Sequence, residues 1–75
     1  MSTTFAFEIT HKSGTVDCFS VSADRLNNAW FTAQRLTGAA TIKTVKVRAP
    51  DALGDTYWHP LHEAQKMEHI ARVTV

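Results

Sequence analysis

Residues 24–36, DRLNNAWFTAQRL, decide the fold because they read as one amphipathic helix. At about 100° per residue, the apolar side chains of this helix gather in a single stripe formed by Leu26, Ala29, Trp30, Ala33 and Leu36. Phe31 falls roughly opposite the stripe, on a side shared with Asp24, Asn28 and Arg35. The stripe is expected to pack on the rest of the protein, whereas Phe31 needs a different cover.

The ends of this helix carry recognisable signals. Ser22 is a suitable N-cap, and Asp24 in the first turn favours the positive end of the helix dipole. Thr37 and Gly38 end the helix, with Gly38 expected in a left-handed conformation.

Three segments alternate as strands do. Phe5, Phe7 and Ile9 point one way in the first, and Phe19 and Val21 share a side of the second, residues 16–21. The loop between them, residues 11–14, places Gly14 at a bulge position, which predicts a hairpin. A third strand is expected over residues 41–49, with inward side chains Val45, Val47 and Ala49 and outward side chains Thr44, Lys46 and Arg48.

The last third of the sequence is harder to interpret. Residues 51–55 suggest a loop, residues 56–58 a short strand, and Pro60 the first position of a two-turn helix over residues 61–68. An irregular excursion is the alternative. Residues 69–75 alternate again and predict a final strand.

The predicted fold is a single compact α+β domain, residues 1–75, with the order β-β-α-β-(short α)-β. A helix with one apolar stripe covers a sheet with one apolar face, so we expect two layers, with a four-stranded, mainly antiparallel sheet and one main helix. A single helix leaves the outer sheet face to solvent or a partner, and that face is predicted to carry Ala6, Glu8, Val16, Cys18, Thr44, Lys46, Arg48, Ile70 and Arg72.

Composition and charge narrow the function classes. The chain has 75 residues, 44% of them hydrophobic, and eight basic against seven acidic residues give a net charge of +1. This balance argues against an acidic DNA mimic and against a protein that coats nucleic acid. A single cysteine, no signal peptide and no long apolar run predict a cytoplasmic protein.

No catalytic, cofactor or metal motif stands out, so we expect no enzyme, no cofactor and no metal. His59, His62 and His69 with Glu63 come nearest to a metal site, but the H-E-x-x-H spacing is missing and surface histidines are the expected reading. Cys18 has no patterned base beside it, as a nucleophile needs.

The candidate binding residues are therefore aromatic and polar. Phe31 is covered either by the chain's own excursion over residues 50–62, through Tyr57 and Trp58, or by a partner or a second copy. The predicted partner-binding residues are Phe31, Asn28 and Arg35 on the helix, Lys46 and Arg48 as rim charges, and Tyr57.

A small nucleic-acid-binding module is the alternative function. Lys43, Lys46 and Arg48 with Arg72 would form a basic patch on the outer sheet face. Single-stranded nucleic acid also needs exposed aromatic side chains for stacking, and none can be placed there. Direct contact with nucleic acid is therefore not expected.

The hairpin over residues 5–21, the helix over 24–36 and the strand over 42–48 follow an order that resembles small phage-encoded anti-CRISPR proteins, inhibitors of type I CRISPR-Cas surveillance complexes. The resemblance lies in size and layout and implies a non-catalytic inhibitor, in the host cytoplasm, that binds a Cas subunit and blocks target DNA binding. Some such inhibitors act by acidic mimicry, from which the near-neutral charge here departs. A direct aromatic and polar contact with a Cas protein is the expected mode.

Overall fold

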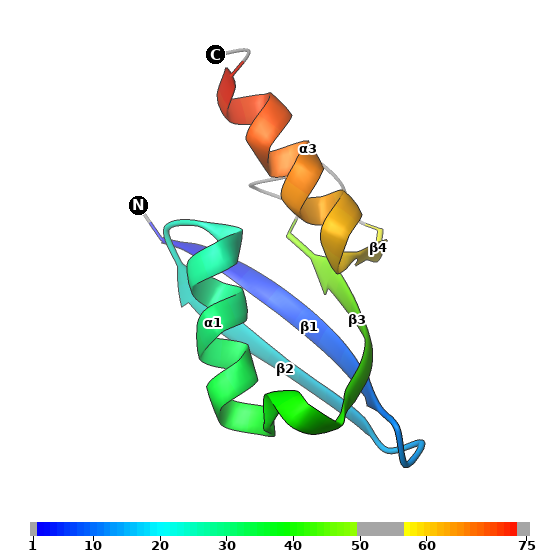
Figure 1. The fold of residues 1–75 in the computed structure, drawn as a ribbon. Helices are drawn as coiled ribbons and strands as arrows, with labels where there is room; N and C mark the ends of the chain where they lie inside the picture. The colour runs from blue at the N-terminus through cyan, green and yellow to red at the C-terminus, as the bar shows by residue number, and fades with distance from the viewer. Residues whose placement is uncertain (1, 50–56, 74–75) are drawn as a thin grey trace.

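The computed structural model describes residues 2–49 and 57–73, and the side chains of 2–49 and 57–70. Within these residues, a four-stranded antiparallel sheet has the order β2-β1-β3-β4 and carries the helices α1 and α3 (Figure 1). Its elements in chain order are β1 (Thr3–His11), β2 (Val16–Ala23), α1 (Leu26–Thr37), the 3-10 turn η1 (Ala39–Thr41), β3 (Ile42–Arg48), β4 (His59–Pro60) and α3 (Leu61–Val73). The α+β class with a four-stranded antiparallel sheet is as predicted.

The β1–β2 hairpin is confirmed together with its turn. The amide of Gly14 donates to the carbonyl of His11 at 2.9 Å, and the amide of His11 donates to the carbonyl of Thr15 at 2.8 Å. Gly14 has a φ of 93°, which only glycine adopts without strain. The register follows, with Phe7 opposite Phe19 and Phe5 opposite Val21.

The core lies between α1 and one face of the sheet. Its buried members are aromatic and aliphatic, and comprise Phe5, Phe7, Ile9, Val21, Leu26, Ala29, Ala33, Val47, Ala49 and Ala64. Trp30 packs against this core, with its ring 6.1 Å from that of Phe7. The predicted stripe is confirmed except at Leu36, which is 68% exposed because it lies on the flank of the stripe.

The start of α1 differs from the prediction. Ser22 belongs to β2, Asp24 precedes the helix, and the N-cap residue Arg25 makes no side-chain capping bond. The carboxylate of Glu68 on α3 caps the helix instead, accepting from the amide of Leu26 at 2.9 and 3.1 Å. The predicted end is confirmed, since Gly38 has a φ of 85°.

The predicted helix over residues 61–68 is confirmed as the first part of α3, whereas the predicted strands on either side of it were wrong. The short strand is His59–Pro60, and residues 57 and 58, the described part of the predicted one, lie outside it. Where a final strand was expected from residue 69, helix α3 continues to Val73. Residues 61–70, LHEAQKMEHI, are mostly good helix formers, and they outweigh a short alternation. Ile70 and Arg72 therefore lie on a helix and not on the outer sheet face. The predicted loop over 51–55 lies outside the described residues.

Candidate functional site

Phe31 lies on the outer face of α1 and is 66% exposed. Asn28 and Arg35 share that face and are exposed as well. Residues 57–62, the described part of the predicted excursion, leave Phe31 uncovered, and Tyr57 and Trp58 are themselves 72% and 38% exposed. An exposed aromatic beside an amide and a guanidinium has the composition of an interface anchor.

Lys46 and Arg48 lie on the other side of the molecule. Both side chains are on the outer face of the sheet, where Lys46 is opposite Glu8 and Arg48 is opposite Ala6 on β1. The aromatic side chains of β1 and β2 all point to the inner face, and Arg72 belongs to α3. The structure therefore brings together the helix residues of the predicted site but separates them from its rim charges.

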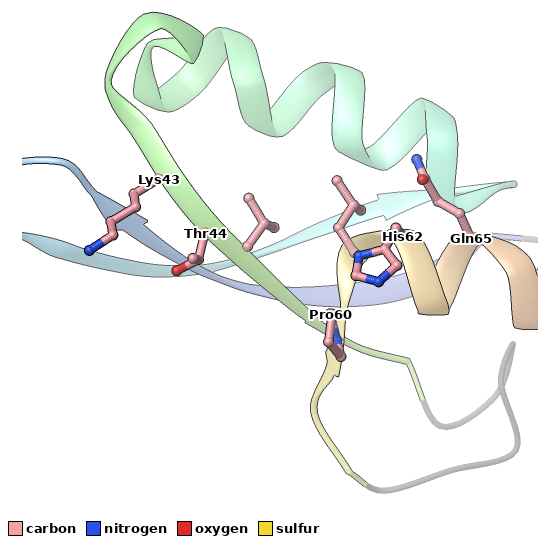
Figure 2. A pocket seen from close by; sticks show the side chains of 7 residues that line it. Lys43, Thr44, Pro60, His62 and Gln65 are labelled. Carbon is pink, nitrogen blue, oxygen red and sulfur yellow. The ribbon is translucent and has the colours of Figure 1, made fainter.

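A groove opens between β3 and the first turns of α3, next to α1 (Figure 2). Its volume is about 340 Å³, and its apolar lining comes from Val45 on β3 and from Leu61 and Pro60 at the start of α3. His62 and Lys43 add polar groups at its sides. Such a groove suits an apolar side chain of a partner, with polar contacts around it.

A hydrogen bond connects the groove to the part of α1 that carries Phe31. Gln65 lines the groove, and its side-chain amide donates to Oδ1 of Asn27 on α1 at 2.9 Å. Phe31 follows Asn27 by four residues, so the two side chains are neighbours along the helix. We call this surface, formed by Asn28, Phe31 and Arg35 with the groove, the α1–α3 surface.

A polar cluster ties the hairpin end to the end of α1. The buried His11 ring has Nε2 at 2.7 Å from Oδ2 of Asp17 and Nδ1 at 2.8 Å from Oγ1 of Thr41, and the Thr37 hydroxyl donates to the same Asp17 oxygen at 2.7 Å. These hydrogen bonds, that from Thr37 most of all, lower the pKa of Asp17. The cluster joins β1, β2, α1 and η1 and thereby holds the helix on the sheet.

The described histidine and cysteine side chains are not arranged for metal binding or for thiol catalysis. Within residues 2–49 and 57–73, no group of three His, Cys, Asp or Glu side chains is placed to hold a metal ion. His59 is on β4, whereas His62 and His69 are exposed on α3. Cys18 is a free, exposed thiol on the outer sheet face.

Sequence reasoning missed the groove and the cap. Val45, Leu61 and Gln65 form the groove only when α3 packs beside β3, and the sequence predicted a short helix over residues 61–68 without showing where it packs. Nothing local marks Glu68 as a cap, because it is 42 residues from the amide that it binds.

Comparisons with known proteins give no relative. None of the described helices combines the length and the apolar character needed to cross a membrane. No family model matches this chain, and no curated protein or solved structure shows significant similarity to it.

Proposed function

We propose that this chain binds another protein through the α1–α3 surface and acts by covering that protein's surface, without turnover. The exposure of Phe31 carries the proposal, because 66% of a large apolar side chain remains in contact with water. Full burial of such a side chain is worth about 1.5 to 3 kcal/mol. A partner that covers Phe31 would therefore gain part of this free energy on binding.

Each residue of the surface has a distinct role in this proposal. Phe31 is the anchor, and the exposed Asn28 and Arg35 orient the partner by hydrogen bonds and charge. The groove accepts a second apolar side chain. Tyr57 is a further aromatic contact, whereas Lys46 and Arg48 take part only where a partner reaches around the sheet edge.

The proposed partner is a subunit of a type I CRISPR-Cas surveillance complex, whose DNA-binding surface the chain blocks in the host cytoplasm. The resemblance of the chain in size and element order to phage anti-CRISPR proteins supports this choice. The net charge of +1 favours contact by aromatic and polar side chains over mimicry of DNA.

Binding to a purified type I surveillance complex, measured by biolayer interferometry, tests the proposal. Phe31→Ala is expected to weaken binding at least fivefold, about 1 kcal/mol, while the melting temperature stays nearly unchanged. The matched control is Val16→Ala, because Val16 is 50% exposed on the outer sheet face.

Two results contradict different parts of the proposal. Absence of binding by the natural sequence removes this class of partner. Binding that Phe31→Ala leaves unchanged removes the α1–α3 surface. A large fall in melting temperature for Phe31→Ala would show that this side chain supports the fold.

A further inference from the structure

We propose that β2 pairs with β2 of a second copy of this chain, so that two sheets form one antiparallel sheet across a two-fold axis. β2 is an end strand in the order β2-β1-β3-β4. Within the part of the chain that the structure describes, no strand pairs with its second side. This inference goes beyond the proposed function, because it concerns a different edge of the molecule.

The hairpin geometry shows which backbone groups face this free edge. The His11 amide donates to the Thr15 carbonyl, and bonded pairs in an antiparallel ladder recur at every second residue. Asp17, Phe19 and Val21 therefore bond to β1. The even-numbered residues direct their amides and carbonyls to the free edge, and they are Val16, Cys18, Ser20 and Ser22.

Most of the features that protect an edge strand are missing from β2. The strand, VDCFSVSA, contains no proline, lysine or arginine, and its register with β1 is continuous without a bulge. Its one charge is Asp17, on the inner face, whose carboxylate already accepts from Thr37 and His11. Eight residues of regular strand are thus open to pairing.

The longest symmetric pairing places Phe19 opposite its copy. In that register Cys18 is opposite Ser20 and Val16 is opposite Ser22. All four residues whose backbone groups face the free edge are then paired, and roughly eight hydrogen bonds form. Phe19 is only partly buried, although its ring lies 6.1 Å from that of Phe7. Its copy would complete the burial in a close, non-hydrogen-bonded pair.

Leu36 supplies a second apolar contact at this edge. Trp30 contacts Phe7 on β1 and Asn27 contacts Gln65 on α3, so the other flank of α1 faces the free side of β2. Leu36, 68% exposed, lies on that flank. Since α1 packs mainly on β2, pairing the strands brings the two copies of α1 towards each other on the inner face of the joined sheet.

A second copy fits this edge because the contact is complementary to itself. In the symmetric register Phe19 meets its own copy and Asp17 is opposite Val21, so no like charges face each other. The free donors and acceptors of one strand match those of the other.

Sedimentation equilibrium from about 1 µM to about 1 mM, the range of moderate to weak affinity, tests the pairing. The natural sequence is expected to approach twice its 8.3 kDa mass. Ser20→Pro removes an amide at the free edge and Leu36→Lys places a charge in the contact, so both are expected to stay monomeric with an unchanged circular dichroism spectrum. Phe31→Ala, on the other side of α1, is the control and is expected to dimerise.

The proposal is overturned if the natural sequence is a monomer at every concentration. It is also overturned if Ser20→Pro and Leu36→Lys both still dimerise. If Ser20→Pro fails to fold, Leu36→Lys still decides. A dimer lost equally in Phe31→Ala would place the contact on the α1–α3 surface instead.

Disulfide trapping tests the register. Ser20→Cys places a new thiol opposite Cys18 of the second copy, at a Cα separation of about 5.5 Å that a disulfide can span. Mild oxidation is expected to give a covalent dimer of this variant, whereas Ser22→Cys, two residues out of register, gives far less. Equal trapping in the two variants contradicts the register.

Discussion

Replacing Glu68 by alanine is expected to lower the free energy of unfolding by about 2 to 3 kcal/mol. The Glu68 side chain is 8% exposed, and both of its oxygens accept from the Leu26 amide. Loss of a capping side chain costs about 1 kcal/mol, and leaving a buried amide without an acceptor costs about 1 to 3 kcal/mol. These costs overlap, because both count the same amide.

Thermal unfolding followed by circular dichroism measures the effect. At about 4–8 °C per kcal/mol for a domain of this size, Glu68→Ala is expected to lower the melting temperature by roughly 8–24 °C. Glu68→Gln keeps one acceptor oxygen but loses the charge that favours the helix N-terminus, so its loss is expected to be about half.

Lys66→Ala is the matched control, since Lys66 is exposed two residues earlier on the same helix. It is expected to change the free energy of unfolding by less than about 0.5 kcal/mol. A melting temperature of Glu68→Ala within about 2 °C of the natural sequence, under 1 kcal/mol on the same scale, would refute the reasoning. It would mean that water or a local group replaces the carboxylate at no cost.

Two further substitutions and one binding assay test other parts of the structure. Thr37→Val removes the main hydrogen bond to Asp17, so the pKa of Asp17, measured by NMR titration of its carboxyl carbon, is expected to rise towards its ordinary value. Because the pKa of Asp17 is lower in the folded state, Asp17 stabilises the fold at pH values above its unfolded-state pKa. This contribution disappears as the pH falls through the folded-state pKa. The loss of stability in acid should therefore be smaller in Thr37→Val. Gly38→Ala forces a φ of 85° on a residue with a Cβ and is expected to cost about 1 kcal/mol or more in urea unfolding. Fluorescence anisotropy with single-stranded DNA at low salt should show no binding, because no aromatic side chain of β1 or β2 faces outward; saturable binding would favour the nucleic-acid alternative.

The sequence alone predicted the elements that depend on a short-range pattern of residues. Period-two alternation predicted the hairpin, a helical stripe predicted α1, and Gly14 and Gly38 marked two turns through their positive φ. These signals depend on residues close in sequence. They therefore survive without knowledge of the tertiary contacts.

The errors fall where distant residues compete with local signals. Ser22 has the chemistry of an N-cap, but pairing opposite Thr4 keeps it in β2, and Glu68 binds the Leu26 amide instead. Alternation near the C-terminus suggested a strand. The alternation covers few residues, however, whereas helix propensity acts over the whole of α3. Exposure of Phe31 was left open, since only the packed structure shows which segment covers it.

The Glu68 cap also has a kinetic consequence. The hairpin forms from neighbouring residues, but the first turn of α1 cannot be completed until α3 has docked, so this contact is expected to form late in folding. Mutations at Glu68 should then accelerate unfolding far more than they slow folding. Release of α3 would free the start of α1 at the same moment, and amide hydrogens at both places should exchange in a single opening event.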